Sequence, residues 1–415
     1  MAYRHVKGGL DRAVDEAKRR NMFDEFVVDI DCHQGEPFSL FDEYLTGDQR
    51  KELRKRSQIE TLEYKREYEA YNLQDLANPN STAKQLEEFK VWRRGRSTIT
   101  KEVRELHGRV KRPELRQNDN MLFTQSVEDF IDTWTVRMHD IGIKSSIIFP
   151  NRFLFQLGNS PNPKLENAMV NAYMDYMLDN FLGKYPEILS CVVVSPARPD
   201  DAANLIQRVG SEKGVVGVTI NPAQMRLAGD ESWNPIYAAA QKKNLPVCFH
   251  TDPGSALPPF DLFNREKYLP AHALGFPWWL ILQMTSIVTS GIPERFPHLK
   301  FVFIEGGVTW VPWLMYRLDT EYRMRRSEAA YLKKMPSEYI KEFYFSSQPL
   351  EKPQNIGDLE WVFKAFNGED HIMYASDYPH WDFDLPSTIY NLPFLSKEGK
   401  TKILGKNALR VFKIS

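Results

Sequence analysis

The sequence has little cysteine, almost no net charge and no long apolar run. Its 415 residues include three cysteines and carry a formal net charge of −1. A small, odd number of cysteines argues against a disulfide framework, and the N-terminus lacks an apolar signal core, so we expect a cytoplasmic protein. The charge balance excludes a global field that would attract nucleic acid or an anionic membrane. The most apolar stretch, residues 276–292, is interrupted by Pro277, Gln283 and Gly291. It is short for a membrane span and predicts a buried helix instead.

Eight short β-rich segments alternate with helical patterns along the chain. The β-rich segments are residues 26–30, 144–149, 189–194, 215–220, 246–250, 300–304, 343–347 and 371–375. Apolar residues recur at helical spacing in residues 162–182, 199–210, 235–244, 275–290, 310–325 and 359–367. This alternation predicts parallel strands, and the eight repeats favour a single α/β domain over residues 1–415, a (β/α)8 TIM-type barrel.

One long segment, residues 45–116, interrupts the alternation after the first strand. It is dense in Lys, Arg and Glu, and its mixed charges argue against nucleic-acid binding. A solvated helical excursion would explain its composition. Because an insertion of this length inside a compact domain usually has a function, we expect a cap over the site or an oligomer arm.

Metal-binding types of residue stand at the ends of several predicted strands. Asp31 and His33 lie two apart on the first strand, so both side chains point the same way. His250 ends the fifth strand, and Asp377 follows the eighth. In a barrel the C-terminal ends of all strands share one face, so we expect these four side chains to bind one divalent ion. Asp377 is also a candidate general base, because a carboxylate there can accept a proton from bound water.

Two further residues, Glu305 and His272, are candidates for a second metal site. Glu305 ends the sixth strand before two glycines, and His272 is expected in a loop. The first four ligands leave a divalent ion formally neutral, which favours manganese or iron over zinc. Six ligands, three His and three carboxylates, resemble a dinuclear non-haem iron or iron–manganese site. Glu305 as a catalytic acid or base, or in a buried salt bridge, and His272 in a plain polar contact, are the alternatives.

Other polar residues are candidates for contacts to the ligands or the substrate. The two arginines among them could clamp a carboxylate, and the alternative for each is an ordinary surface arginine. The candidates are Glu36, His380, Asp382, Arg152 and Arg226.

These motifs resemble the amidohydrolase superfamily, and within it the amidohydrolase-2 branch, which is similar to carboxymuconate-semialdehyde decarboxylases. The resemblance runs from residue 27 to the end, apart from the insertion. It implies the barrel fold and metal-dependent catalysis. The motifs are DIDCHQGEP (29–37), HDIGI (139–143), PVCFH (246–250), FIEGGVTWVP (303–312), YASDYPH (374–380) and ILGKNA (403–408).

The chain departs from the family pattern at three places. The usual His-x-His is Asp31-x-His33, and Glu305 stands where the decarboxylases carry a catalytic histidine. No lysine ends the fourth strand, which excludes a carbamylated lysine bridge. These departures resemble those of the 2-aminoisobutyrate hydroxylase type, a smaller set of relatives that bind two transition metals, hydroxylate with oxygen and pair two homologous subunits.

We therefore expect an oxygen-dependent hydroxylase, that is a monooxygenase, of a small polar or carboxylate substrate. Its cofactor would be iron and/or manganese, with zinc as the alternative, and O2 would be a co-substrate. The resemblance also implies a homo- or hetero-oligomer with a related chain. One alternative function is a hydrolase or a non-oxidative decarboxylase with one divalent metal. The other is a supporting subunit with a structural metal.

Overall fold

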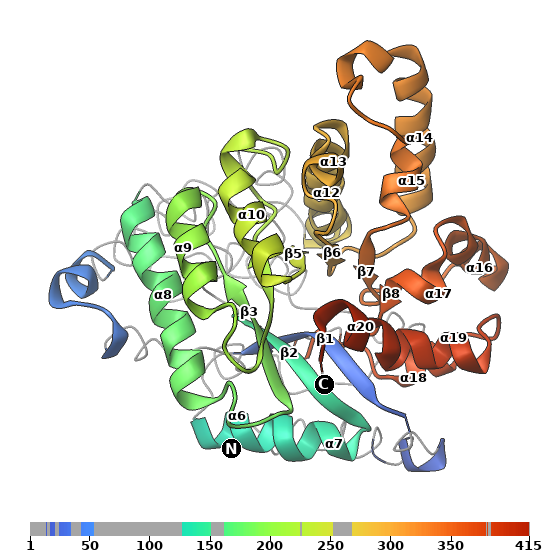
Figure 1. Ribbon diagram of the computed structural model, residues 1–415. Helices are drawn as coiled ribbons and strands as arrows, with labels where there is room; N and C mark the ends of the chain where they lie inside the picture. Colours follow the sequence, from blue (N-terminus) through green and yellow to red (C-terminus); the bar gives the residue numbers. More distant parts are fainter. Residues whose placement is uncertain are drawn as a thin grey trace, which may run out of the picture.

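The computed structural model shows parallel strands surrounded by helices (Figure 1). It describes residues 14, 17–20, 25–34, 43–53, 127–150, 162–224, 226–251, 268–378, 380 and 383–414. Residues 54–116 of the charged insertion lie outside the described residues, and so do Glu36, Arg152 and Asp382.

All eight predicted strands are present, in sequential order, and each pairs in parallel with the next. The strands consist largely of Val, Ile and Phe because one face lines the barrel interior and the other packs under helices. The prediction of a (β/α)8 barrel is confirmed. The strands are β1 (Val27–Gln34), β2 (Ile143–Pro150), β3 (Ile188–Val193), β4 (Val215–Ile220), β5 (Val247–His250), β6 (Phe301–Ile304), β7 (Tyr344–Ser346) and β8 (Ile372–Met373).

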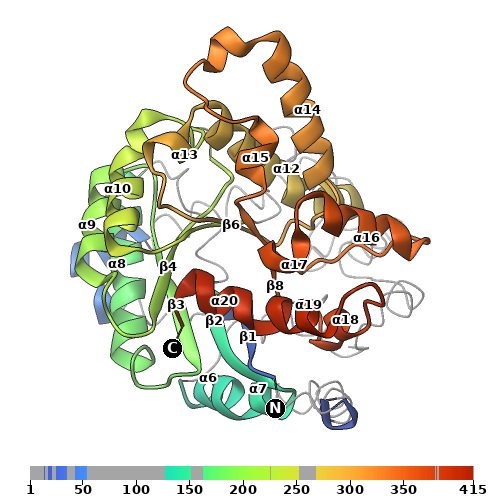
Figure 2. The ribbon, with the colours of Figure 1, turned by 45° about the vertical axis from the view of Figure 1, so that its right-hand side comes forward.

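Helices cover the outside of the barrel, as Figure 2 shows for α8, α9 and α10 on one side and α16 to α19 on another. The six predicted helices are confirmed. The α-helices are α6 (Val127–Asp132), α7 (Met138–Asp140), α8 (Pro163–Asn180), α9 (Pro199–Val209), α10 (Asn234–Lys243), α12 (Tyr268–Thr289), α13 (Ile292–Arg295), α14 (Val311–Met324), α15 (Pro336–Ile340), α16 (Ile356–Ala365), α17 (Gly368–His371), α18 (Ser387–Tyr390), α19 (Lys397–Thr401) and α20 (Asn407–Phe412). Two π-helices, η3 (Thr133–Arg137) and η7 (Lys402–Lys406), and two 3₁₀ helices, η5 (Glu231–Trp233) and η6 (Arg326–Ala329), complete the described set.

Helix α12 begins seven residues before the predicted start, at Tyr268 instead of residue 275. Pro270 lies in its first turn, where a backbone N–H has no intrahelical partner, so proline is tolerated there. Among the described helices, none combines the length and the apolar character that crossing a membrane requires.

The barrel interior is a packed apolar core, and α20 closes one end of it. Ala408, Val411 and Phe412 of α20 belong to the same cluster of buried side chains as the inward-facing residues of the strands. Lys300, directly before β6, donates a hydrogen bond of 3.3 Å to the carbonyl of Arg410. The closed end is therefore the one where the strands begin, which leaves the ends of the strands for a functional site.

The barrel closes between β1 and the segment that follows β8. The amide of Ile30 donates to the carbonyl of Tyr374 (3.0 Å), and the amide of Asp377 donates to the carbonyl of Asp31 (2.8 Å). A parallel bridge between Cys32 and Tyr378 continues the pairing. We call this junction the β1–β8 seam. It places the residues after β8 directly against the end of β1.

A β-bulge changes the direction of the side chains within β1. Between Asp29 and Cys32 the strand advances three residues while β2 advances two. Val28 and Ile30 pack in the barrel interior, whereas Cys32 packs in the outer core. Because of the bulge, Asp31 faces the interior although it directly follows an inward-facing residue.

Candidate metal centre

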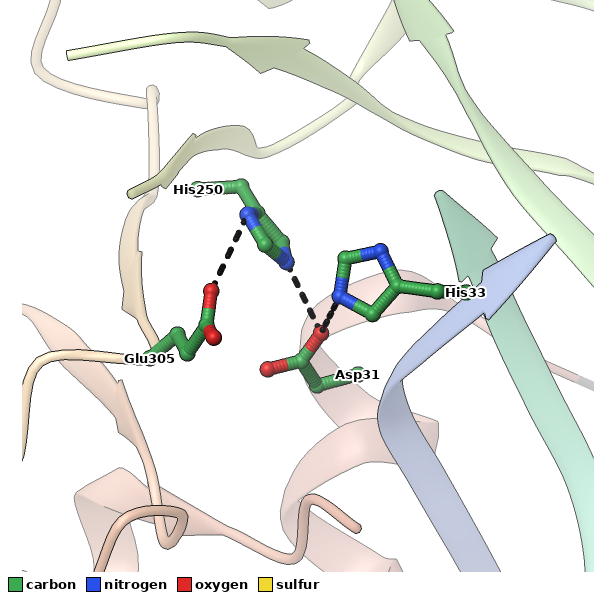
Figure 3. A group of neighbouring side chains, drawn as sticks. All are labelled: Asp31, His33, His250 and Glu305. Carbon is green, nitrogen blue, oxygen red and sulfur yellow. Dashed lines mark hydrogen bonds and ion pairs between the residues drawn. The ribbon is translucent and has the colours of Figure 1, made fainter. Parts of the chain in front are cut away.

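Four buried side chains from three strands meet at the end of the barrel where the strands finish (Figure 3). Asp31 and His33 come from β1, His250 ends β5, and Glu305 follows β6. His250 Nε2 lies 2.8 Å from Asp31 Oδ1, and His33 Nε2 lies 3.4 Å from the same oxygen. His250 Nδ1 lies 3.7 Å from Glu305 Oε2. One ligand atom of each residue lies within 4.8 Å of the others, a separation that one ion can span.

A second group shares His33 with the first. It consists of His33, Asp377 and His380. Asp377 Oδ1 lies 3.2 Å from His33 Nε2 and 2.5 Å from His380 Nδ1. The ring centroids of His33 and His380 lie 4.3 Å apart. All four ligands predicted for the first ion therefore lie in one connected cluster, and the contact of His380 with Asp377 is direct.

Atoms in this cluster lack hydrogen bonds in a way that fits a cation. Asp31 Oδ2 and His33 Nδ1 are buried and make no hydrogen bond, while His33 Nε2 faces the carboxylates of Asp31 and Asp377. Buried polar atoms without partners are rare in proteins, because each one costs free energy. Imidazole nitrogens and carboxylate oxygens together suit manganese, zinc or iron. The residues present therefore fit a divalent metal ion.

The histidines and carboxylates perturb one another strongly. Burial alone would lower the pKa of His33, but hydrogen bonds and charges from Asp31 and Asp377 outweigh it and raise the pKa to about 10. Burial alone would raise the pKa of Asp377, but the charge of His380 and hydrogen bonds from both histidines hold it well below its usual range. The pKa of Asp31 is lowered in the same way, mainly by His250. Without metal, the cluster therefore keeps a proton on His33 next to two ionised carboxylates.

Metal binding is expected to release a proton. A metal ligand must be the neutral imidazole, so the proton that gives His33 a pKa of about 10 has to leave. At a pH below that value, the apparent affinity for Mn²⁺ should rise by about tenfold per pH unit for one displaced proton. Calorimetric titration at pH 7 to 8.5, in buffers of different ionisation enthalpy, measures the number of protons released. An affinity that does not change with pH would contradict this prediction.

The backbone at the two ligands after β6 and β8 has an unusual conformation. Glu305 has a φ of 65° and Asp377 a φ of 60°, in the left-handed region that residues other than glycine rarely adopt. The amide of Glu305 donates to Ser346 Oγ (2.8 Å), and Gln348 Nε2 donates to Asp377 Oδ2 (3.4 Å). Such strain is common at functional sites, where the surrounding structure enforces it. The last residue of β7, Ser346, and Gln348 just after it therefore support these two residues.

Two predicted site residues are not among the clustered side chains. The prediction that His272 lies in a loop is wrong: it is in α12, with its ring 4.9 Å from that of Phe276. Neither group of metal-binding side chains among the described residues includes it. Arg226 is exposed and donates a hydrogen bond of 3.1 Å to Ser232 Oγ in the nearby helix η5.

Three other buried residues contact the cluster and did not stand out in the sequence. Phe149, the penultimate residue of β2, has its ring 4.6 Å from that of His250. Gln348 bonds to Asp377, as described above. Asp29 accepts a hydrogen bond from the amide of Asp31 (3.2 Å), and burial raises its pKa to about 7. The rule that sites form at strand ends could have found Phe149 and Gln348.

Comparisons with known proteins agree with this fold. A family model described as Amidohydrolase matches residues 150–414. The γ-resorcylate decarboxylase of Rhizobium radiobacter is 23% identical over 301 residues, which is 69% of this chain and 88% of that protein.

Two solved structures share the fold at low identity. An amidohydrolase of Mycobacterium avium subsp. paratuberculosis K-10 superposes with a TM-score of 0.65 at 19% identity, over 94% of this chain and 99% of that chain. The 5-carboxyvanillate decarboxylase of Novosphingobium aromaticivorans, complexed with manganese and 4-hydroxy-3-methoxy-5-nitrobenzoic acid, has a TM-score of 0.60 at 18% identity, over 94% and 96%.

These relatives correct the expected reaction. Two of them are named decarboxylases, whereas the departures at Asp31 and Glu305 predicted an oxygen-dependent monooxygenase. That prediction is wrong, because the two substitutions change the ligands of the site and do not by themselves identify the reaction. The matched family model spans more than half of the chain and includes β3 to β8 with four of the clustered residues, His250, Glu305, Asp377 and His380. The chain belongs to the amidohydrolase family of enzymes.

Proposed function

We propose that the protein is a metal-dependent, non-oxidative decarboxylase of a small aromatic carboxylate. The observation that carries the proposal is the buried cluster of Asp31, His33, His250, Glu305 and Asp377 at the open end of the barrel. The names of the relatives support decarboxylation, and their substrates support an aromatic acid.

Asp31, His33, His250 and Asp377 would hold the ion, with Glu305 beside it. Manganese is our first choice, because carboxylate-rich sites suit it and a structural neighbour binds it. When bound, a divalent ion orients the substrate carboxylate and stabilises negative charge that develops on the substrate. The chain itself supplies the shape of the site, excludes water and moves one proton.

Decarboxylation breaks the bond between the carboxylate and the ring carbon. Carbon dioxide leaves, the electron pair stays on the ring carbon, and that carbon must take up one proton. His380 Nδ1 and Asp377 Oδ1, 2.5 Å apart, can share this proton. The side chain of Asp377 is 1% exposed, whereas that of His380 is 20% exposed. We propose that Asp377 transfers the proton to the substrate and that His380 restores it from solvent.

Replacing Glu305 should show whether it binds metal. We expect Glu305→Gln to lower the rate by about 10²-fold, because the neutral amide keeps the shape but neither carries charge nor exchanges a proton. If Glu305 is a ligand, the metal content of the purified variant falls as well. Glu360→Gln, on the exposed face of α16 beside Lys364, is the control. Normal metal content with normal turnover would exclude Glu305 from the mechanism.

The reaction itself can be tested directly. Protein loaded with Mn²⁺ is incubated with γ-resorcylate, 5-carboxyvanillate and salicylate, and released CO2 and the decarboxylated product are measured. We expect CO2 release from at least one acid, equal in air and under nitrogen, and none from the methyl esters. Absence of CO2 from every acid, or hydrolysis of the esters in its place, would contradict the proposal.

The assembly of the protein remains a prediction. We propose that residues 45–116 form a cap or an oligomer arm of a single barrel domain, as their length and charge suggest. Assembly with identical or related chains and a cytoplasmic location are likewise predicted from sequence. Light scattering of the purified chain would measure its oligomeric state.

A further inference from the structure

We infer that Asp29 is a positioning residue that joins the two ligand-bearing edges of the barrel at the β1–β8 seam and so sets the metal affinity. The inference rests on the proposed metal centre, but Asp29 itself is not one of the clustered ligands. Asp29 is fully buried and lies where the β-bulge of β1 begins, just before the proposed ligands Asp31 and His33.

One oxygen of Asp29 holds two backbone amides. Asp29 Oδ1 accepts hydrogen bonds from the amide of Ser376 (2.8 Å) and from the amide of Asp31 (3.2 Å). The first amide belongs to the residue before Asp377, and the second belongs to a proposed ligand. A single side chain therefore links the backbone of Asp31 to that of Ser376, which lies 347 positions after Asp29 and directly before Asp377.

The strand ladder does not satisfy both of these amides at this point. β8 ends at Met373, and the register of β1 is irregular between Asp29 and Cys32. A backbone amide buried without a partner is costly, so a side-chain acceptor has to replace the missing ladder bond. A carboxylate oxygen accepts two N–H groups at once and is suited to the task.

The neighbouring bonds fix the turn that carries Asp377. The amide of Asp377 donates to the carbonyl of Asp31 (2.8 Å), and the amide of Tyr378 donates to Ser376 Oγ (3.0 Å). Together with the bond from the amide of Ser376 to Asp29, these hydrogen bonds hold the amides of three consecutive residues, 376–378. They keep Asp377 at its φ of 60°. Loss of the Asp29 bond would allow Asp31 and Asp377 to separate.

Metal binding depends on ligand positions to within a few tenths of an ångström. Partners that orient metal ligands typically contribute about 10- to 100-fold to metal affinity. We expect Asp29→Ala to weaken Mn²⁺ binding by that factor. Asp29→Asn retains an acceptor oxygen for the two amides. Its affinity for Mn²⁺ should therefore stay within about threefold of the parent's, a much smaller change than the loss expected for Asp29→Ala.

The two variants also separate positioning from general stability. Asp29 Oδ2 makes no hydrogen bond, so the side-chain NH2 group that Asp29→Asn introduces would be buried without an acceptor, and this variant should unfold at a lower temperature. Ser190→Ala is the control, because Ser190 Oγ bonds to the carbonyl of Ile148 (2.8 Å) in the same barrel but away from the seam. It should lower the melting temperature without changing the affinity.

Calorimetric titration of chelator-treated protein with Mn²⁺, alongside thermal unfolding of each metal-free variant, tests the inference. If Asp29→Ala does not fold, Asp29→Ser, which is too short to bridge both amides, takes its place. Affinities of the Ala or Ser variant equal to the parent would overturn the inference. An affinity lost equally in Ser190→Ala would also overturn it, because the effect would then follow stability. A parent chain that binds no metal would instead contradict the proposed function.

Discussion

Removal of the metal is expected to abolish turnover completely. The side chains proposed to hold the ion are all buried, and atoms of Asp31 and His33 have no other hydrogen-bond partner, so no protein group can replace the ion. Protein dialysed against a chelator should show no CO2 release, and Mn²⁺ should restore it. At a Mn²⁺ concentration of 100 times the dissociation constant, the ion should stabilise the fold by about 2.7 kcal/mol.

Magnesium is the control for metal removal. It prefers near-ideal octahedral oxygen coordination and keeps several waters, so a site with two imidazoles should discriminate against it. Elemental analysis and melting curves of the dialysed and reloaded protein would accompany the assay. The expected loss of turnover on metal removal is total. Full turnover would therefore contradict both the proposed site and the proposed reaction, if the protein is shown to contain less than a hundredth of an equivalent of transition metal.

Replacement of Asp377 should have the largest effect among single substitutions. Asp377→Asn keeps the shape of the side chain, but its amide cannot pass a proton to the substrate or receive one from His380. General acid–base catalysis contributes about 10²- to 10⁴-fold, so we expect kcat to fall by roughly 10³-fold. Metal affinity should also fall, because a neutral oxygen replaces a carboxylate beside His33.

Asp370→Asn is the matched control for Asp377→Asn. Asp370 pairs with Lys402 at 2.8 Å, and its side chain is 49% exposed, so the substitution should leave kcat unchanged. Assays of Asp377→Asn at saturating Mn²⁺ separate the loss of proton transfer from the loss of metal. A kcat within tenfold of the parent under those conditions would remove Asp377 from the proton-transfer step.

Most of the fold was predictable because parallel strands leave a strong pattern. The segments at 215–220 and 246–250 are mostly apolar, as is typical of strands buried on both faces, and they match β4 and β5 closely. The strand-end rule then grouped Asp31, His33, His250 and Asp377. The rule works because a barrel brings all C-terminal strand ends to one face, whatever their separation in sequence.

The remaining details depend on backbone irregularities that the sequence does not reveal. Strict alternation would place Asp29 on the same face as Asp31, but the bulge between them directs Asp29 to the seam instead. His272 was expected in a loop because the helical spacing was recognised only from residue 275, whereas α12 begins at Tyr268 and also packs over the residue after Glu305. Leu280 of α12 would lie 2.3 Å from a Cβ added to Gly306. The reaction was not predictable because one set of ligands serves several chemistries.

The β1–β8 seam also has a consequence for the kinetics of folding. Its bonds join Asp29 to Ser376, so the chain between them has to be placed before the seam can form. Non-local pairings of this kind form slowly, because closing a long loop costs conformational entropy before any stabilising contact has formed. Proposed ligands of the metal, Asp31 and Asp377, lie on both sides of the seam. Mn²⁺ present during refolding should therefore act late, by slowing the reopening of a barrel that has already closed.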